Sequence, residues 1–406
     1  MTEKPNQQPT ILCLSSYEKG DDFLRECKRQ GCHVVLVTVK KLGESSYWPR
    51  EAIDEIYMLP SDELNTQPDI TYAISYLART RKFASIVALD EFDIEIAASL
   101  REHLRIPGMG ETTARRFRDK LAMRIEAREL GIRVPEFSGV INYDDLKEFI
   151  ERISPPWVLK PRLSASAIGI KKIHSGEELW RTLDELGDEQ SFRVLEKYIP
   201  GEIFHVDSII WDGEVVFAAA HGYGQPPLNV MHEGGIFTTH SLLRGSDDEQ
   251  ALQQLNRQLL KSFRLVRGVA HSEFIKGEDG KFYFLETAAR VGGAYISEVV
   301  KAATGIDLWS EWACVEVAHI KQQPYSLPPL KNDYAGIVLS LAKQEEPDTS
   351  AYTESEIVFR VHKKHHVGLV VASPSVERVQ SLIANYTERF YQDFHASVPP
   401  PDKPTA

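Results

Sequence analysis

The sequence predicts a mixed fold in which a parallel α/β unit is followed by an α+β region. Across residues 11–108, short apolar runs alternate with helical patterns, as is typical of a parallel sheet covered by helices. Beyond about residue 190, strand-like runs are joined instead by tight turns such as 211–214, which favour antiparallel pairing. The length of 406 residues exceeds one ordinary hydrophobic core, so several domains are expected.

In the N-terminal unit, buried strands are expected at 11–16, 33–39 and 85–89, with helices at 21–31, 69–83 and 93–104. The third strand runs directly into Asp90 and Glu91. Ligands gather at the carboxyl ends of parallel strands, so either side chain could contact a substrate, although either could equally cap the next helix. The dipeptide at 107–108 closes the unit.

A helix is expected over 114–131, and the second region begins after it, at 134–137. Strands are expected at 156–162, 168–173 and 192–210, and helices at 177–186 and 247–265. After the two prolines at 328–329, a smaller C-terminal α+β region contains strands at 335–342 and 367–373 and a helix at 375–391. The proline-rich tail, 399–406, is expected to be disordered.

Composition narrows the function classes. A net charge of -12 argues against nucleic acid, whose phosphates require a basic face. The N-terminal residues do not resemble a targeting signal, and no run reaches the ~18 apolar residues of a membrane span, so a cytoplasmic protein without membrane contact is expected. The four cysteines lack CxxC spacing and are interpreted as reduced thiols. The histidine-rich segment 362–366 is interpreted as a solvated strand or loop.

The most informative segment is the hairpin expected over residues 271–293. Asp279-Gly280 is a strong signal for a two-residue turn, and pairing outward from it places Glu273 directly opposite Glu286. Like charges at that distance, roughly 4.5–5.5 Å between Cβ atoms, destabilise a sheet unless something positive lies between them. The sequence therefore predicts a cation at this pair.

Either of two groups could supply the positive charge expected at this pair. Lys276 or Lys281 could neutralise two exposed glutamates. Alternatively, Mg²⁺ or Mn²⁺ could bind the pair together with substrate phosphates, because hard cations take oxygen ligands of both kinds.

The usual nucleotide motifs are missing, since neither a P-loop nor a complete dinucleotide fingerprint occurs. A different phosphate apparatus is present. Lys160 precedes a loop of small residues, 163–169, whose amides and hydroxyls could fold over phosphates, and Lys120 begins a helix. Each feature alone is weak evidence for a phosphate site, because a lysine near a strand end is usually a solvent-exposed residue without a binding role.

In their order along the chain, these motifs resemble the ATP-grasp superfamily, in particular the branch with biotin carboxylase, the large chain of carbamoyl phosphate synthase and the amino-acid ligases. The motifs are IPG at 106–108, DKLAMR at 119–124, VLKPR at 158–162, LEKYIPGEIFHVD at 195–207, HSEF at 271–274, and FLETAAR with RVGG at 284–293. The resemblance covers almost the whole chain. It implies a pre-ATP-grasp domain at 1–108, an ATP-grasp domain at 109–325 with a mobile lid at about 134–195, and a C-terminal region at 326–398.

The resemblance also implies roles for individual residues. ATP phosphates would contact Lys120, Lys160 and the lid loop with Ser164, Ser166 and Gly169. Adenine would contact the hinge, Glu196, Lys197, Tyr198 and Ile199, and further nucleotide contacts are implied at Glu202, facing the ribose, and at His205. The metal ligands would be Glu273 and Glu286, and Arg290, Gly292 and Gly293 would hold the acyl group.

Some of these residues have a simpler interpretation. Glu196 could form an ordinary salt bridge with Lys197 or Arg193. Glu233, in the polar segment 221–245, could bind an amine or act as a base, and could equally be a loop charge.

Two departures from the family pattern matter for the activity. Ala288 stands where the family commonly has an asparagine metal ligand, so the metal shell depends on the two glutamates. The lid loop contains one glycine where biotin carboxylases have many, and no biotin-attachment segment is present.

The leading hypothesis is an ATP- and Mg²⁺-dependent ligase that activates a small carboxylate, with amino acids among the candidates, as an acyl phosphate and transfers it to an amine. The expected partners are small-molecule carboxylate and amine substrates, with no nucleic acid and no membrane, and a homodimer is left open. The alternatives are a biotin-dependent carboxylase subunit and a nucleotide-binding module that has lost turnover.

Overall fold

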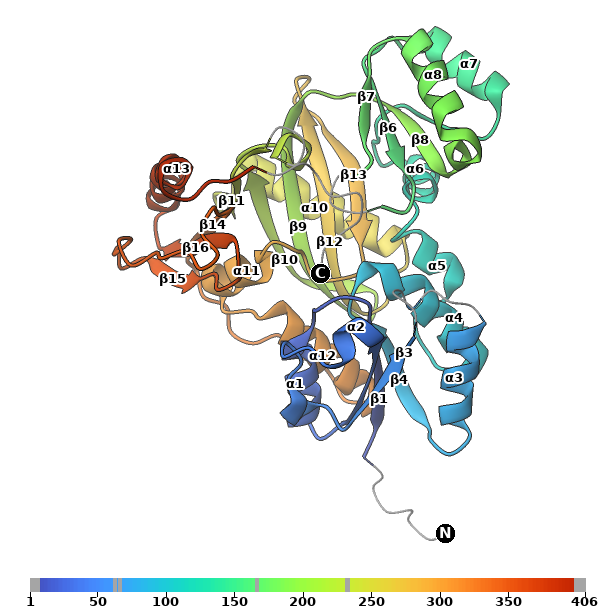
Figure 1. Ribbon diagram of the computed structural model, residues 1–406, viewed down its shortest axis with the longest axis vertical. Coiled ribbons are helices and arrows are strands. Elements are labelled where there is room, and N and C mark those ends of the chain that lie inside the picture. Colours follow the sequence, from blue (N-terminus) through green and yellow to red (C-terminus); the bar gives the residue numbers. More distant parts are fainter. Residues whose placement is uncertain (1–7, 61–63, 65–67, 165–167, 231–233, 398–406) are drawn as a thin grey trace.

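The structure is a computed structural model that describes residues 8–60, 64, 68–164, 168–230 and 234–397 (Figure 1). The predicted tail at 399–406 lies outside these residues. A parallel sheet forms the N-terminal unit, and two antiparallel sheets follow it. The expected fold class is therefore confirmed.

The N-terminal sheet has the strand order β3-β2-β1-β4. Its strands are β1 (Thr10–Ser15), β2 (His33–Val39), β3 (Glu55–Leu59) and β4 (Phe83–Ala88), and its main helices are α1 (Asp21–Arg29), α3 (Asp69–Ala78) and α4 (Ile94–Leu104). The sequence prediction missed β3. This edge strand is only half-buried, so it lacks the continuous apolar run that identified its three neighbours.

A small antiparallel sheet, called the lid sheet below, stands apart from the rest of the chain in Figure 1 and has the order β5-β8-β6-β7. Its elements are β5 (Phe137–Gly139), α7 (Tyr143–Arg152), β6 (Trp157–Pro161), β7 (Lys171–Ile173), α8 (Gly176–Leu186) and β8 (Arg193–Lys197). Helices α7 and α8 bury Leu146, Phe149 and Leu179 against Trp157 and Leu195 of the sheet. The lid sheet thus has a hydrophobic core of its own.

The central sheet has eight strands in the order β13-β12-β9-β10-β11-β14-β16-β15. They are β9 (Gly201–Trp211), β10 (Glu214–Tyr223), β11 (Phe237–Ser241), β12 (Gly268–Gly277), β13 (Phe282–Ala288), β14 (Tyr334–Leu341), β15 (Ile357–Arg360) and β16 (His366–Ser373). The C-terminal strands therefore extend the central sheet rather than forming a sheet of their own. Alternation along β14 sends Val338 toward α13 and Ile337 toward α11, so helices cover both faces at this end.

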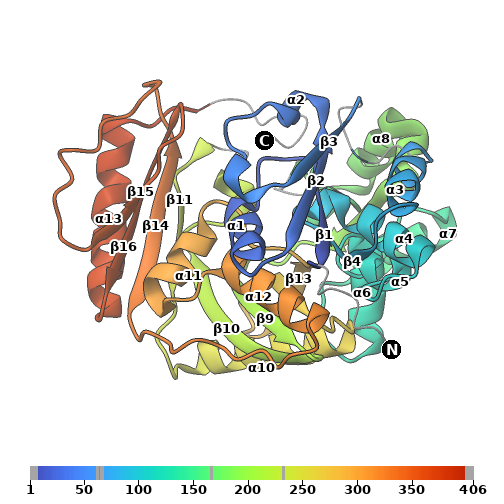
Figure 2. The ribbon, with the colours of Figure 1, turned by 90° about the horizontal axis from the view of Figure 1, so that it is seen from below.

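The remaining helices connect or cover these sheets (Figure 2). The longer ones are α6 (Lys120–Glu129), α10 (Asp247–Ser262), α11 (Ile296–Thr304), α12 (Leu308–Ile320) and α13 (Val376–Asp393). Shorter turns are α2 (Lys40–Gly43), η1 (Arg50–Ala52), η2 (Glu91–Asp93), α5 (Glu111–Arg115), η3 (Gly187–Phe192) and α9 (Pro227–Asn229). Helix α12 packs on β9 and β12 as well as on α1, which joins the N-terminal unit to the central sheet through one shared core. None of the helices in the described ranges has the length and apolar character needed to cross a membrane.

The β12–β13 hairpin places Glu273 opposite Glu286, as predicted, but the turn and the register of the hairpin differ from the prediction. The turn has three residues rather than two, because the Gly277 amide donates to the Lys281 carbonyl and Gly280 adopts φ +73°. A bulge between Glu273 and Phe274 then shifts the register by one residue. The two deviations cancel, and the carboxylates meet on one face of the sheet.

Candidate active site

A cavity of about 420 Å³ lies between the lid sheet and the central sheet. Most of the predicted site residues line it: Lys120, Lys160, Ser164, Glu196, Lys197, Tyr198, Ile199, Glu273, Glu286, Arg290 and Gly293. Four predicted residues do not line it: Gly169, Glu202, His205 and Gly292. Ser166 and Glu233 lie outside the described residues.

The opposed glutamates are each held by a partner from another element. Lys120, the first residue of α6, places Nζ 2.7 Å from Glu286 Oε2 and donates to the Ser164 carbonyl at the same distance. The Tyr223 hydroxyl donates to Glu273 Oε1 at 2.7 Å, and His271 Nε2 lies 3.5 Å from that oxygen. Burial alone would raise the pKa of Glu273, but the hydrogen bond and charge of His271 outweigh it and lower this pKa. Inside the cavity, Glu273 is thus hydrogen-bonded to Tyr223 and Glu286 is paired with Lys120.

The alternative that Lys276 or Lys281 neutralises the pair is wrong. Lys276 pairs with Asp248 at 2.7 Å, and Lys281 with Asp279 at 3.8 Å. Period-two alternation places residue 276 on the face of β12 opposite to Glu273, and residue 281 lies in the turn before β13.

Lys160 and Glu196 form the wall of the cavity on the lid side. Lys160 Nζ lies 2.5 Å from Glu196 Oε2, and Arg124 Nε of α6 lies 2.9 Å from Glu196 Oε1. All three side chains are at least nine-tenths buried. The alternative pairing of Glu196 with Lys197 or Arg193 does not occur, since Lys197 donates to the Ser154 carbonyl and Arg193 to the Gly169 carbonyl.

Burial lowers the pKa of Lys160, and Glu196 only partly compensates. An anion at the mouth of the cavity, such as an ATP phosphate, would therefore stabilise the charged form of Lys160.

The hinge backbone between β8 and β9 follows Glu196. The amides of Lys197 and Tyr198 donate to the carbonyls of Glu136 and Pro156. The Ile199 amide has no backbone or side-chain acceptor among the described residues. It therefore fits the expected hydrogen-bond donor to adenine, in a slot whose other walls are apolar, including Val158, Ile168, Ile203 and Leu285.

Arg290 pairs with the N-terminal unit. Its Nε and NH2 donate to Glu91 Oε1 at 3.0 and 2.6 Å, and Arg118 NH1 lies 3.5 Å from the other carboxylate oxygen. Burial would raise the pKa of Glu91, but Arg290 and Arg118 lower it to about 2. Sequence reasoning placed Glu91 at a strand end facing a ligand but gave no signal for this ion pair. NH1 and NH2 of Arg290 each retain one further N–H for a substrate anion.

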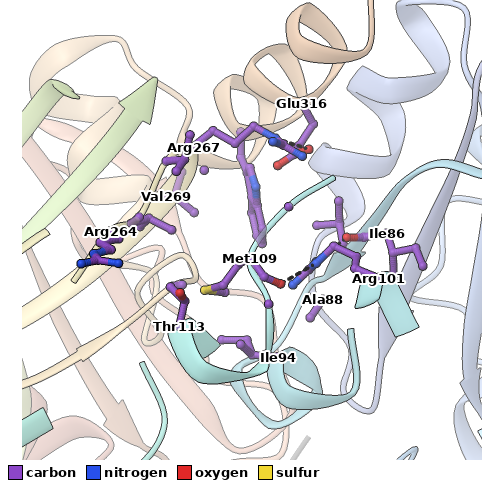
Figure 3. Close-up of a pocket in the computed structure, with 18 residues that line it drawn as sticks. Ile86, Ala88, Ile94, Arg101, Met109, Thr113, Arg264, Arg267, Val269 and Glu316 are labelled. Carbon is purple, nitrogen blue, oxygen red and sulfur yellow. Dashed lines mark hydrogen bonds and ion pairs between the residues drawn. The ribbon is translucent and has the colours of Figure 1, made fainter. Parts of the chain in front are cut away.

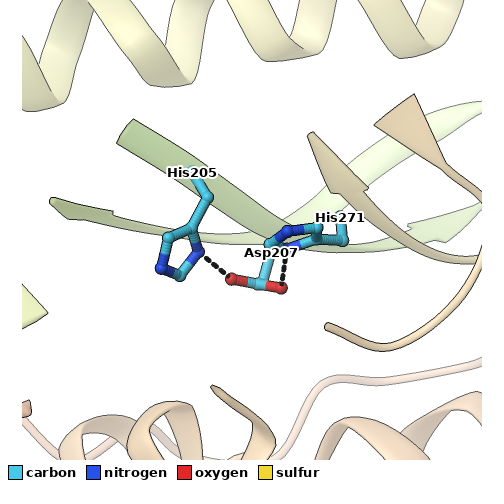
Figure 4. A group of neighbouring side chains, drawn as sticks. All are labelled: His205, Asp207 and His271. Atoms are coloured by element: carbon cyan, nitrogen blue, oxygen red, sulfur yellow. Dashed lines mark hydrogen bonds and ion pairs between the residues drawn. The ribbon is translucent and has the colours of Figure 1, made fainter. Parts of the chain in front are cut away.

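Three residues form a buried cluster (Figure 4), with His205 and Asp207 on β9 and His271 on β12. Asp207 Oδ2 accepts from His205 at 2.7 Å, and Asp207 Oδ1 pairs with His271 Nδ1 at 2.9 Å. Burial would lower the pKa of His271, but Asp207 and Glu273 raise it to about 9. The resulting imidazolium lies between Asp207 and the Glu273 carboxylate and positions the latter.

This cluster corrects the prediction for His205, which is fully buried and bonds Asp207 and Thr239 rather than lining the cavity. It also accounts for Gly292, because a Cβ there would lie 2.9 Å from Asp207 Oδ1. The close approach of the loop to the cluster, rather than contact with a ligand, therefore requires glycine at this position.

The buried carboxyl group of Asp93, outside the cavity, makes the stability of the fold depend on pH. It accepts hydrogen bonds from the Ser16 amide at 2.7 Å and hydroxyl at 2.6 Å, and burial together with Asp90 raises its pKa from 3.8 to about 7. Because the folded-state pKa is the higher one, its contribution to stability is full below pH ~4 and is lost as pH rises toward 7.

We therefore expect Asp93→Asn to gain stability relative to the natural chain between pH 5 and pH 7, by about 1–3 kcal/mol. Urea unfolding at both pH values measures the difference. Asp144→Asn, on an exposed position of α7, is the matched control and should show no such pH dependence. A pH-independent difference for Asp93→Asn would show that its carboxyl is ionised throughout.

Comparison with known proteins agrees with this geometry. Residues 153–298 match the family model described as the ATP-grasp domain. The chain contains an ATP-grasp domain. It is 29% identical over 283 residues to the L-arginine-specific L-amino acid ligase of Bacillus subtilis, and the aligned part covers 67% of each chain. It is 23% identical over 236 residues to a D-alanine–D-alanine ligase of Neisseria meningitidis, covering 54% of this chain and 74% of that one.

Among solved structures, the L-amino acid ligase of Bacillus licheniformis aligns with a TM-score of 0.75 at 17% identity, over 96% of this chain and 98% of that chain. This likeness shows that the whole architecture, from the parallel sheet to the C-terminal strands, is shared. The resemblance to the ATP-grasp superfamily is confirmed by the family match over residues 153–298.

Proposed function

We propose that this protein is an ATP- and Mg²⁺-dependent ligase that joins a small carboxylate to an amine, with amino acids as substrates. One observation carries the proposal: the Glu273–Glu286 pair shares a cavity with Lys120, Lys160 and Arg290. This set of charges suits a triphosphate and a divalent cation at one end and an acyl anion at the other. The relatives named as amino-acid ligases support the same reaction class.

The donor set fits Mg²⁺. Two carboxylates face each other on adjacent strands, and hard cations bind a few carboxylates together with substrate phosphates. Ala288, paired with His271, supplies no ligand, so Glu273 and Glu286 would hold the ion together with phosphate oxygens. When bound, Mg²⁺ would spread the negative charge that develops on the transferring phosphoryl group.

In the proposed reaction, a substrate carboxylate oxygen attacks the γ-phosphorus and ADP leaves. The amine nitrogen then attacks the acyl carbon, inorganic phosphate leaves, and the nitrogen loses a proton. Lys120 and Lys160 would hold the phosphates in line, while the free N–H groups of Arg290 would orient the carboxylate. The neighbouring Glu91 fixes the Arg290 side chain and so limits where the carboxylate can lie.

The acyl end of the cavity is apolar. Beyond Tyr223 and Arg290, its described walls are Pro227, Leu228, Val230, Phe237, Ile296 and Leu339. Burying an apolar side chain against such walls is favourable, at about 25 cal/mol per Å², whereas a charged side chain would need a partner. These walls favour a substrate amino acid with an apolar side chain. Glu233, outside the described residues, remains the predicted amine-binding residue.

The test is a screen of phosphate release with pooled amino acids, MgATP and the purified chain, with mass spectrometry of the products. We expect phosphate release only with a carboxylate and an amine present, and a product whose mass equals their sum less one water. Stimulation by bicarbonate alone would favour the carboxylase alternative. ATP binding without turnover in every mixture would favour a module that has lost activity.

A further inference from the structure

A second cavity, of about 350 Å³, lies away from the ATP-grasp site, between the N-terminal unit and the central sheet (Figure 3). Its apolar walls include Ile86, Ala88, Ile94, Met109, Val269 and Trp312, which come from β4, α4, β12 and α12 and from the segment before α5. The volume lies at the lower end of the range for small-molecule sites, ~300–1,000 Å³. The cavity is large enough for a compact organic ligand.

The charged residues that line this cavity are three arginines and one glutamate. Arg267 and Glu316 neutralise each other, with Nε 3.1 Å from Oε2. Arg101 donates to the carbonyls of Met109 at 2.9 Å and Ile86 at 2.6 Å, and no described carboxylate lies within ion-pair distance of it. The cavity therefore contains a guanidinium group without a counter-ion.

Burial lowers the pKa of Arg101, Glu316 opposes this and Arg267 adds to it, and together they bring this pKa to about 10. A buried cation without a carboxylate costs free energy until an anion reaches it. Arg264 lies two residues after Ser262, the last residue of α10. Its guanidinium adds a second cation at the exposed rim of the cavity and has no ion-pair partner among the described residues. The net surplus is two positive charges, from three arginines less one glutamate.

We propose that this cavity is a second binding site, for a small carboxylate that carries an apolar group. The carboxylate would bind the Arg101 guanidinium, Arg264 would add a second positive charge at the exposed rim (Figure 3), and the apolar group would bury against Met109, Val269 and Trp312. A neutral apolar molecule would leave the two cations unpaired, and a bare anion would leave the apolar walls exposed to water. The proposal does not depend on the ligase reaction.

The place of the cavity suggests what binding would affect. Ala289 of its wall is followed directly by Arg290, and Ala88 of β4 is followed three residues later by Glu91. The two ends of the Glu91–Arg290 ion pair are thus both attached to the wall. A ligand in this cavity contacts the backbone that positions the acyl end of the other site.

The experiment is isothermal titration of the full chain with 3-phenylpropionate and 4-methylpentanoate, each compared with its uncharged amide. We expect at least one carboxylate to bind with a Kd below about 1 mM and its amide to bind at least ~10-fold more weakly. Arg264→Gln should weaken carboxylate binding at least ~5-fold, because it removes one of the two positive charges of the cavity that have no carboxylate partner. Arg264→Lys should restore most of the affinity.

Arg257→Gln, an exposed position on α10 bonded only to Gln253 in the described chain, is the charge-matched control and should leave the Kd unchanged. Three results would overturn the proposal: no binding by either carboxylate, equal binding by the amides, or the same Kd in Arg264→Gln. The last result would assign the probe to another site, such as the acyl end of the ATP-grasp cavity. Because Arg264 lines only the second cavity among those described, failure here leaves the ligase proposal intact.

Discussion

Glu286→Gln is expected to reduce MgATP turnover by roughly 1000-fold, or about 4 kcal/mol of transition-state stabilisation. Glutamine keeps the shape of the side chain but removes the charge that opposes Glu273 across the hairpin and pairs with Lys120. The metal would then have one carboxylate instead of two, since Ala288 offers no replacement. Phosphate release at saturating ATP, titrated with Mg²⁺, measures both the loss and the shift in Mg²⁺ affinity.

Glu278→Gln is the matched control, because it makes the same chemical change at the exposed turn of the same hairpin. Its turnover should stay within about twofold of the natural chain. Unaltered turnover in Glu286→Gln would remove this residue from the metal site. A loss of folding is distinguished by thermal unfolding, where both variants should resemble the natural chain.

The sequence was sufficient for the fold class and for the pairing of the two glutamates. The pairing was nevertheless correct only because two deviations from the predicted hairpin cancel. An Asp-Gly turn signals a hairpin, yet it does not distinguish a two-residue loop from a three-residue loop that ends in Gly280. The compensating bulge after Glu273 has no local signature. What fixes the register is burial of Phe274 and Phe284 on the opposite face, which is a tertiary effect.

Contacts between elements far apart in sequence were the part that could not be predicted. Arg290 and Glu91 are separated by 199 residues, and each was identified separately as facing a ligand. Likewise, the family motif places His205 near the nucleotide. In the structure, Asp207 instead hydrogen-bonds the His205 imidazole, which is fully buried. Periodicity does not indicate this, because His205 and Asp207 share the face that also carries Glu273.

Arg124 is a further example. It lies in the motif DKLAMR, yet only the fold brings its fully buried guanidinium to Glu196 on β8. Sequence reasoning considered pairs local to Glu196 and so missed the partner that most affects stability.

Glu196→Gln is accordingly expected to have the largest effect on stability, about 3–5 kcal/mol, because it removes the carboxylate shared by two buried cations. Lys160 can release its proton, and burial already lowers its pKa. Arg124 cannot, since arginine remains charged in proteins. The unpaired guanidinium would then lie inside the contact between α6 and the lid sheet. Urea unfolding measures the loss, and Glu136→Gln, an exposed partner of Arg152, is the control expected to change stability by less than about 1 kcal/mol.

The double variant Arg124→Met with Glu196→Gln separates two explanations of that loss. If the cost comes from an uncompensated charge, replacing Arg124 as well should recover at least half of the free energy, since a neutral pair of similar volume is often tolerated. If it comes instead from packing around Glu196, the double variant should be no more stable than the single one. ATP affinity should stay reduced in both variants, because Lys160 loses the carboxylate that keeps its ammonium group charged at the phosphate end of the cavity.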